Sequence, residues 1–284
     1  MNDLYNHAMN FDVSGKRMTD KEIIAKSKEL GFQGVELLHS FDAEIAFLLE
    51  EYDMKATHVM QNLTFPGFME NIPVMQKAGI RYINMSPNFY DHDTAMKCAE
   101  LLNKEGKKAK EYGFKVYYHN HTNEFWFDEV DRQYLWETVV KNTNPEYVCF
   151  QLDVGFSNMT GADAVYLLKK YPGRIELMHI RPCTKIIGSG KVFRTTLLNE
   201  AGRPGSPDFG KKEELPPPVE MIEQIKLTES AEGRMSENIH NLDSIMNIAK
   251  ESGCQVFILV RNAFYHEDRV QVIQEDVQYI RKFW

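Results

Sequence analysis

Short apolar runs alternate with amphipathic segments along almost the whole chain. A short apolar run bounded by turn residues is typical of a buried strand, whereas apolar residues three and four positions apart are typical of a helix face. This pattern predicts eight strands, each followed by a helix or a segment of helix length. The predicted strands are residues 4–11, 34–39, 55–60, 80–85, 114–119, 147–153, 174–180 and 255–261. The predicted helices cover about 19–30, 41–51, 68–78, 93–112, 130–140, 163–170, 236–252 and 268–283.

Strands that alternate with helices pair in parallel, because each helix carries the chain back to the start of the next strand. Eight such units in 284 residues predict one (β/α)8 TIM barrel, with residues 1–284 forming a single domain. An open, doubly wound sheet is the alternative fold. That fold often carries a glycine-rich phosphate loop, and neither GxGxxG nor GxxxxGK[S/T] occurs in the sequence. We therefore expect the closed barrel.

One connection is much longer than the others. Residues 181–235, between the seventh predicted strand and the next helix, are rich in Gly, Pro and Lys and include Pro216–Pro218. We expect an irregular insertion at about 182–220 that is more mobile than the barrel. A connection of this length is usually a lid, a surface for a partner or a disordered segment, and the sequence leaves all three open.

Polar or ionisable residues end seven of the eight predicted strands. In a TIM barrel, the C-terminal ends of the strands surround the active site. One polar residue at a strand end is commonly a cap or a loop hydrogen bond, but several titratable groups at one end of a barrel indicate a site. The residues are Glu36, His58, Asn84, His119, Asp153, His179 and Arg261. The other histidines lack this placement and are expected to be incidental: His7, His39, His92, His240 and His266.

Three of these strand ends carry ligand types that suit a divalent cation. Asp153 ends an apolar strand, His179 ends the next one, and His119 ends the strand before them. Two imidazoles and one carboxylate form a facial set that leaves coordination positions open for a substrate. The same residue types also form hydrogen-bonded clusters without a metal. The sequence thus predicts a metal site here, with a metal-free polar cluster as the alternative.

Composition excludes several classes of function. The formal net charge of −8, with basic residues spread along the chain, argues against nucleic-acid binding. No apolar run reaches the length of a membrane span, and the N-terminus lacks the apolar core of a signal peptide. Four widely spaced cysteines are typical of reduced thiols in an intracellular protein: Cys98, Cys149, Cys183 and Cys254. We therefore expect a cytoplasmic protein with a small-molecule substrate.

Four stretches resemble the xylose-isomerase-like TIM-barrel family of sugar phosphate isomerases and epimerases. They cover most of the chain in the family's order: GFQGVELL (31–38), VYYHNHTNEF (116–125), FQLDVGFSNMTGADAVYLLKKYPGRIELMHIR (150–181) and the last strand with its helix. The resemblance implies an aldose–ketose isomerisation or an epimerisation that depends on Mn, Mg, Zn or Co. It also implies a site made of a Glu, an Asp, a His and a second Glu at four strand ends.

The sequence matches this set only in part. Asp153 and His179 stand at the family's Asp and His, and the first Glu position falls on His119. His119 lies in the variant motif HNHxxEF, which also supplies His121 and Glu124. Either His119 takes the place of the first Glu, or Glu124, five residues further on, serves instead.

Two positions depart from the family. The second Glu position falls on Arg261, and the family's HLKD reads HIRP, with Arg181 and Pro182 in place of the Lys and the Asp. An arginine does not deprotonate in proteins, so Arg261 is no base, but it can bind an anionic group by two parallel hydrogen bonds. The alternative is a salt bridge from Arg261 to Glu36 or Asp153. The sequence therefore does not predict a reaction by two glutamates at the family's two positions.

We expect a carbohydrate-active isomerase or epimerase that acts on a sugar or keto-sugar by metal-assisted proton transfer. The predicted catalytic residues are Glu124, Glu36 and His119. The predicted substrate contacts are His58, Asn84, Arg261 and His121, and the predicted metal ligands are His119, Asp153 and His179.

Two other functions fit the same residues. One is the large subunit of a C-glycoside-cleaving lyase that acts on a 3-keto-glycoside, in which case the insertion would bind a small partner subunit. The other is a non-catalytic barrel that binds a sugar, because Arg261 replaces a ligand. The chain could also assemble as a homo-oligomer.

Overall fold

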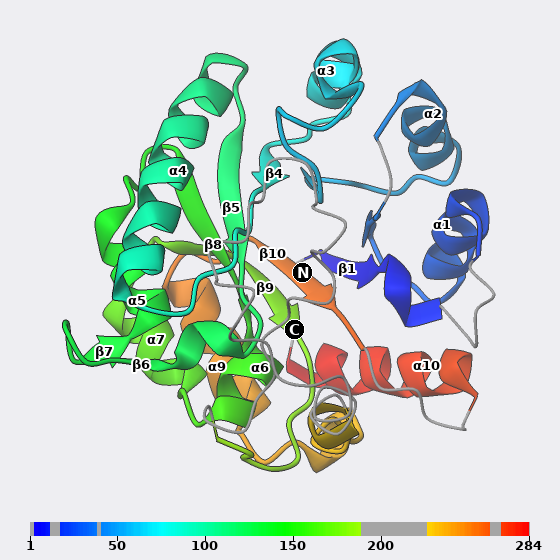
Figure 1. Cartoon of the computed structure of the whole chain (residues 1–284). Helices are drawn as coiled ribbons and strands as arrows, with labels where there is room; N and C mark the ends of the chain where they lie inside the picture. The colour runs from blue at the N-terminus through cyan, green and yellow to red at the C-terminus, as the bar shows by residue number, and fades with distance from the viewer. Residues whose placement is uncertain (1–2, 12–17, 39–40, 189–225, 262–267, 284) are drawn as a thin grey trace.

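Eight short parallel strands form one sheet that curves into a barrel (Figure 1). The computed structural model describes residues 3–11, 18–38, 41–188, 226–261 and 268–283. The barrel strands are β1 Leu4–His7, β2 Gly34–Glu36, β3 His58–Val59, β4 Tyr82–Asn84, β5 Lys115–His119, β8 Val148–Asp153, β9 Ile175–Ile180 and β10 Val256–Leu259. Their order in the sheet is β2-β1-β10-β9-β8-β5-β4-β3.

The two outer strands of this order also meet. Gly34 and Lys55 form a parallel bridge, in which the Val35 amide donates to the Lys55 carbonyl at 2.9 Å. This bridge joins β2 to the residues just before β3 and closes the ring. The predicted (β/α)8 fold is therefore confirmed, and the open sheet is excluded.

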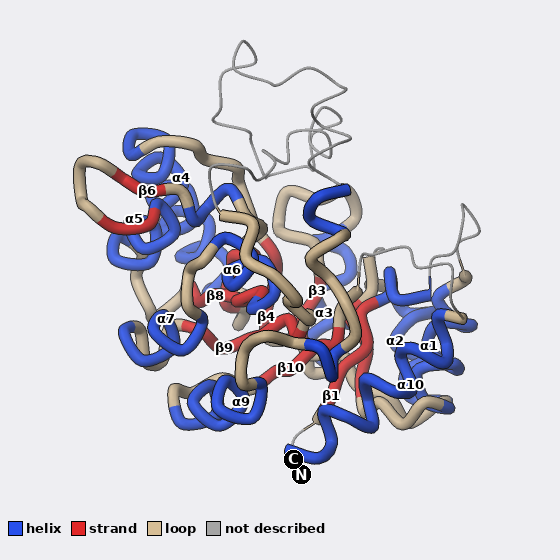
Figure 2. The backbone as a smooth tube through the Cα atoms, turned by 90° about the horizontal axis from the view of Figure 1, so that it is seen from below, coloured by secondary structure: helices blue, strands red, loops and turns tan. Residues whose placement is uncertain are grey.

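Helices surround the strands in both views of the backbone (Figures 1 and 2). The larger ones are α1 Asp20–Glu29, α2 Ala43–Glu51, α3 Phe68–Lys77, α4 His92–Glu111, α5 Leu135–Asn142, α7 Ala164–Lys170, α9 Leu242–Glu251 and α10 Arg269–Ile280. Short elements lie in the connections: η1 Ala8–Phe11, η2 Asn123–Phe125, β6 Phe127–Asp128, β7 Gln133–Tyr134, α6 Val154–Thr160, η6 Met235–Glu237 and η7 Arg281–Phe283. Their caps follow ordinary rules; Thr19, for example, forms a capping box with Glu22.

Several predicted elements have different bounds in the structure; the helix predicted at about 130–140, for example, begins only at Leu135, after strand β7. The first strand ends at His7, and residues 8–11 form η1 instead of continuing the strand. The helix predicted from about residue 236 begins only at Leu242, where Asn241 caps it by accepting from the Ser244 amide at 3.0 Å. Before it, the Asn238 side chain accepts from the Cys183 amide at 2.8 Å, which holds residues 238–241 in a loop.

The barrel interior is filled by one compact apolar layer. Six strands contribute to it, with Tyr5, Tyr82, Tyr117, Cys149, Leu177, Val256 and Ile258. Gly34 has no side chain because the Tyr5 ring fills its space: a Cβ at Gly34 would lie 2.1 Å from that ring. A larger apolar cluster packs between the outer side of the strands and the helices.

The polar strand ends lie directly above this interior layer. Side chains two positions apart on a strand point to the same side. Tyr5 is therefore followed on the inner side by His7, Tyr117 by His119, Cys149 by Gln151 and Asp153, and Leu177 by His179. The fold thus brings these groups together at the C-terminal end of the barrel.

Residues 189–220 of the predicted insertion lie outside the described residues. Within the described ranges, no helix combines the length and hydropathy needed to cross a membrane.

Candidate functional site

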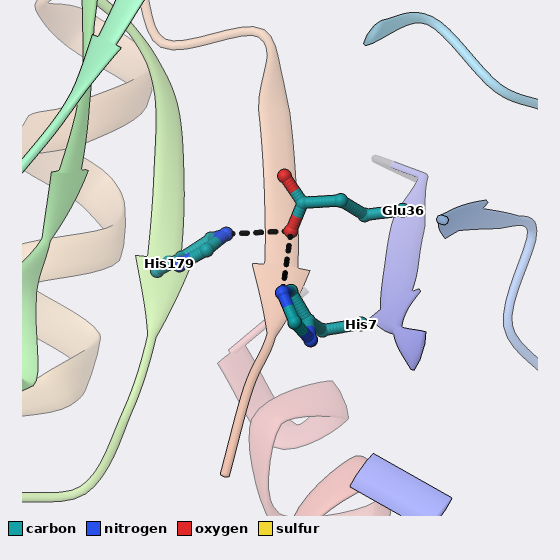
Figure 3. Close-up of side chains that lie close together, drawn as sticks. All are labelled: His7, Glu36 and His179. Carbon is teal, nitrogen blue, oxygen red and sulfur yellow. Dashed lines mark hydrogen bonds and ion pairs between the residues drawn. The ribbon is translucent and has the colours of Figure 1, made fainter. Parts of the chain in front are cut away.

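A buried carboxylate, Glu36, lies at the centre of the polar layer. Its side chain is fully buried and accepts three hydrogen bonds. The donors are His58 Nε2 at 2.9 Å, Gln151 Nε2 at 3.0 Å and His179 Nε2 at 2.7 Å. His7 Nε2 lies 3.5 Å from Glu36 Oε2 (Figure 3). Glu36 is therefore surrounded by nitrogen atoms from four other strands.

The proton positions around Glu36 follow from these contacts. His7 Nδ1 accepts from the Met9 amide at 3.1 Å, and burial lowers the pKa of His7 to about 3. The neutral His7 ring therefore carries its proton on Nε2, the atom that faces Glu36. Burial alone would raise the pKa of Glu36, but His179 and His58 outweigh it and hold that pKa well below its usual range. Glu36 is thus an ionised carboxylate that accepts N–H donors.

His179 connects Glu36 to a second group. Its Nε2 donates to Glu36, and its Nδ1 lies 3.7 Å from Asp153 Oδ2. The rings of His119 and His179 have centroids 4.7 Å apart. Burial would lower the pKa of His179, but the carboxylates of Glu36 and Asp153 raise it to about 9. His179 therefore lies between two buried carboxylates, one on each side of its ring.

Asp153 is fixed from three directions. Its Oδ1 accepts from the Phe156 amide at 2.9 Å, which caps α6, and its Oδ2 accepts from Arg181 Nε at 2.9 Å. Its own amide donates to Asn120 Oδ1 at 3.0 Å. Burial would raise the pKa of Asp153, but Arg181 outweighs it and holds the pKa well below its usual range. Asp153 is therefore an ionised carboxylate in a rigid position.

His119, Asp153 and His179 fit a divalent cation. One ligand atom from each of the three residues lies within 4.8 Å of the other two. The Nδ1 atoms of His119 and His179 are buried and have no hydrogen-bond partner among the described residues. Buried polar atoms are normally paired, so the His119 nitrogen points to a missing partner, whereas His179 Nδ1 has only the Asp153 carboxylate, 3.7 Å away. A metal ion suits a donor set of two imidazoles and one carboxylate. Burial also lowers the pKa of His119 well below its usual value, so its ring is the neutral form that binds metals.

The group around Glu36 fits a cation less well, although His7, Glu36 and His179 also lie close enough together. There the nitrogens carry protons toward the carboxylate, and a donor hydrogen excludes a cation from that position. The third group of this kind, His92, Asp128 and Asp131, lies at the β6–β7 hairpin. There the His92 ring pairs with Asp128 at 2.8 Å, and Asp131 is exposed.

Arg261 lies away from Glu36 and Asp153. Its Nη2 donates to Asp276 Oδ1 at 2.8 Å, its Nε contacts Asp276 Oδ2, and its Nη1 donates to the Gly233 carbonyl at 2.8 Å. The anionic partner is therefore Asp276 on α10, so the alternative of a salt bridge to Glu36 or Asp153 is wrong, and the substrate contact of Arg261 stays a prediction. The arginine that does pair with Asp153 is Arg181.

Glu124 lies near Tyr118, whose side chain points away from the side of β5 that carries His119. Tyr118 Oη donates to Glu124 Oε1 at 2.9 Å, and the His121 amide donates to Oε2 at 2.9 Å. Burial raises the pKa of Glu124 to about 7. These contacts tie the loop after β5 together, and the catalytic role of Glu124 stays a prediction.

The predicted substrate contacts occupy different layers of the site. His58 is buried and donates to Glu36. Asn84 donates to Ser86 Oγ at 3.1 Å, and the same oxygen accepts from the His119 amide at 2.8 Å. The His121 side chain is 28% exposed, which makes it more accessible than His119 or His179. Its ring packs against those of His119 and Phe156, with centroids 4.8 and 5.7 Å away.

Sequence reasoning missed three residues of this site. His7 was set aside as incidental, yet it faces Glu36. The pattern that could have found it is the strand end, because β1 stops at His7 and not at Phe11. Gln151, two residues before Asp153, and Arg181, two residues after His179, follow the same rule: both lie at the ends of strands already predicted.

Comparison with solved structures confirms the predicted fold and the resemblance to xylose-isomerase-like TIM barrels. A sugar phosphate isomerase/epimerase from Parabacteroides distasonis superposes with a TM-score of 0.66 at 16% identity, over 98% of this chain and 93% of that one. The 3-keto-D-glucoside 4-epimerase from E. coli superposes with a TM-score of 0.58 at 11% identity, over 99% of this chain and 100% of that one. At these identities the structures show the fold alone.

The sequence is also similar to an inosose dehydratase from Mesomycoplasma hyopneumoniae. The two are 24% identical over 193 residues, which is 58% of this chain and 62% of that protein. The match thus spans less than two thirds of the relative's own length. No family model matches the chain.

Proposed function

We propose that this protein is a metal-dependent enzyme that removes a proton from the carbon next to the ketone of a sugar or sugar-like ring. The observation that carries the proposal is the group His119, Asp153 and His179, in which the buried Nδ1 atoms of both imidazoles lack a hydrogen-bond partner within the described part of the chain. These three residues would hold a divalent cation of the Mn, Mg, Zn or Co type. When bound, such a cation polarises a carbonyl oxygen and makes the neighbouring C–H bond more acidic.

The surrounding residues have distinct roles in this proposal. Glu36 holds a proton of His179 on Nε2, so a cation bound beside Asp153 would displace the proton that the raised pKa of His179 leaves on Nδ1. His121 is the accessible imidazole beside His119, so it would contact the substrate and accept the proton. Glu36 and Glu124 are weaker candidates for the base, because both oxygens of each carboxylate already accept hydrogen bonds.

The fate of the proton decides the class of enzyme. If the proton returns to the opposite face of the same carbon, the product is an epimer. If it returns to the neighbouring carbonyl carbon, and the hydroxyl proton moves to the former ketone oxygen, the product is an isomer. These outcomes agree with the names of the structural relatives.

A second outcome is favoured by the sequence relative named inosose dehydratase. After the proton leaves, the C–H electrons form a carbon–carbon double bond, and the hydroxyl on the next carbon departs with a proton as water. This dehydration needs the same ketone and the same C–H bond. The dehydratase is therefore our second candidate.

Proton exchange in deuterated water tests the proposal. Protein reconstituted with Co²⁺ or Mn²⁺ would be incubated with an inosose, a 3-keto-glucoside and a free ketose, and followed by proton NMR. We expect the signal of the hydrogen next to the ketone to disappear with one of these substrates. A new stereoisomer identifies an epimerase, and an unsaturated product with loss of water identifies a dehydratase. Binding of metal and sugar without exchange of any such hydrogen would refute the enzyme and leave a sugar-binding barrel.

A further inference from the structure

Two arginines occupy neighbouring strand ends, and Arg181 is the one that contacts the proposed metal site. Arg181 follows β9 and Arg261 follows the end of β10, and Ile180 pairs with Leu259 across these strands. Both side chains are buried, with exposed fractions of 2% and 5%. The two guanidinium groups therefore emerge near each other at the same end of the barrel.

Both arginines reach the same short segment of the chain. Arg181 Nη1 donates to Glu232 Oε2 at 3.0 Å, and Arg261 Nη1 donates to the carbonyl of the next residue, Gly233, at 2.8 Å. Each arginine also binds one carboxylate on its other side, Asp153 for Arg181 and Asp276 for Arg261. Residues 232 and 233 are thus fixed by two adjacent strand ends.

Backbone contacts hold the same segment on the chain that leaves β9. The Thr184 amide donates to the Ala231 carbonyl at 2.8 Å, and the Ile239 amide donates to the Cys183 carbonyl at 2.9 Å. Gly233 lies so close to Thr184 that a Cβ would come within 2.3 Å of its methyl group. We call residues 231–239 the return segment, because they follow the long connection after β9 back to the barrel.

Negative and positive side chains alternate from Asp153 through Arg181 to Glu232. Arg181 lies between Asp153 and Glu232, with distances of 2.9 and 3.0 Å, and the side chain of Glu232 is 3% exposed. A lone arginine beside Asp153 would repel a cation and compete for the carboxylate. Glu232 offsets the arginine's charge and draws the other end of its guanidinium away from Asp153. The Phe156 ring, 4.1 Å from the guanidinium carbon, restricts the arginine further.

We propose that Glu232 is a positioning residue that acts on Asp153 through Arg181. It fixes the guanidinium and offsets its charge, so that Asp153 remains able to hold a cation although an arginine lies next to it. The inference rests on the proposed function, because it takes Asp153 as a metal ligand. It explains how the site can hold a cation at Asp153 although Arg181 lies next to it. It also makes the return segment part of the site.

A double-mutant cycle on metal affinity tests this role. Co²⁺ would be titrated calorimetrically into the wild type, Glu232→Gln, Arg181→Gln and the double variant. We expect Glu232→Gln to weaken Co²⁺ binding about tenfold and Arg181→Gln to tighten it about tenfold. In the Arg181→Gln background, Glu232→Gln should change the affinity less than about threefold, because its effect passes through the arginine. Equal effects of Glu232→Gln in both backgrounds would overturn the proposal.

Glu237→Gln is the matched control, since it removes the same charge from the return segment. Glu237 accepts from the Arg234 amide at 2.8 Å and is exposed. We expect its Co²⁺ affinity to stay within about twofold of the wild type. If Glu237→Gln weakens binding as much as Glu232→Gln does, the effect is one of general charge, and the positioning role is refuted.

Hydrogen exchange of the metal-free protein separates this proposal from the proposed function. The Phe156 amide reports on Asp153, to which it donates, and the Thr184 amide reports on the return segment. Faster exchange at both amides in Glu232→Gln supports the positioning role, even if the wild type binds no Co²⁺ and the metal proposal fails. Faster exchange at Thr184 alone shows that Glu232 only anchors the segment, and unchanged exchange at both shows no role; either result overturns the proposal.

Discussion

The two polar groups that share His179 contain similar residue types but differ in where their protons lie. On one side, Glu36 accepts from His58, Gln151 and His179. On the other side, Asp153 lies 3.7 Å from His179 Nδ1, and the Nδ1 atoms of His119 and His179 have no hydrogen-bond partner among the described residues. In the first group both Glu36 oxygens accept N–H donors, although Gln151 Oε1 has no hydrogen-bond partner among the described residues. In the second group, two imidazole nitrogens lack such a partner.

This difference shows that ligand types alone do not define a metal site. Both groups bring His and carboxylate atoms within 4.8 Å of one another. A cation needs lone pairs directed at it, and a nitrogen that donates a hydrogen bond has none to offer. The carboxylate in the first group instead fixes the tautomer of a ligand in the second, as carboxylates beside metal-bound histidines commonly do. We therefore expect the two groups to respond differently to substitution.

The largest effect is expected from Asp153→Asn. The change removes the one carboxylate of the proposed ligand set but keeps a side-chain oxygen that can accept from the Phe156 amide. We expect Co²⁺ affinity to fall by about 10³-fold or more, which is about 4 kcal/mol of binding free energy, and proton exchange to be lost. Calorimetric titration measures the affinity, and circular dichroism checks the fold. If the variant binds Co²⁺ like the wild type, Asp153 is not a metal ligand, and our distinction between the two groups is wrong.

Arg261→Glu tests whether the last strand end belongs to the second group. If Arg261 faced the metal, the new carboxylate would raise metal affinity by adding a ligand. The structure instead places the guanidinium against Asp276, so the variant puts two carboxylates together in a buried position. We expect a loss of about 3–5 kcal/mol of unfolding free energy in chemical denaturation and no gain in Co²⁺ affinity. Tighter Co²⁺ binding would show that Arg261 does face the site.

The sequence alone predicted the barrel and much of the site for a simple physical reason. Strands alternate with helices at a regular spacing, and the C-terminal ends of parallel strands must meet at one end of a closed barrel. This topology is sufficient to bring Glu36, His119, Asp153 and His179 together, as the structure does. It does not require any knowledge of side-chain contacts.

The remaining features depend on details of one or two residues. His7 was missed because it belongs to the site only if the first strand ends at residue 7, and a periodic pattern predicts the ends of elements least accurately. Arg181 pairs with Glu232, which lies 51 residues away in sequence, and Arg261 pairs with Asp276, which lies 15 residues away. The proton positions around Glu36 depend on contacts such as Met9 to His7, which no residue pattern reveals.

Glu124→Gln tests a third carboxylate, on the opposite side of β5. Burial raises the pKa of Glu124 from 4.5 to about 7, so between these pH values the folded state binds more protons than the unfolded state. This difference in proton binding stabilises the folded state by about 3 kcal/mol below pH 4.5, and that stabilisation is lost as the pH rises to about 7. The glutamine variant should lack this decline, so we expect it to be the more stable protein at pH 8. Denaturation at pH 5 and pH 8 measures the difference.

Glu124→Gln also sharpens the comparison between the two groups. Its carboxylate contacts Tyr118 and the His121 amide, not His179, so we expect its Co²⁺ affinity to stay within about twofold of the wild type. A large loss of affinity would show that Glu124 acts on the metal site, as the sequence motif alone implies.

A smaller loss of metal affinity than that of Asp153→Asn is expected from Glu36→Gln, which leaves all three proposed ligands in place. The new side chain keeps only one acceptor oxygen, so its amide nitrogen meets N–H donors that Glu36 accepts, such as His179 Nε2. Without the Glu36 carboxylate, which raises its pKa, His179 can relieve this conflict by losing the Nε2 proton and keeping the one on Nδ1, the atom that faces Asp153 at 3.7 Å. We expect Co²⁺ affinity to fall by about 10–100-fold, the usual effect of losing a carboxylate behind a metal-bound histidine. Nitrogen NMR of the His179 ring should show the change of tautomer, with Glu124→Gln as the matched buried control. If Glu36→Gln costs more affinity than Asp153→Asn, the cation binds in the group around Glu36, and our assignment of the two groups is inverted.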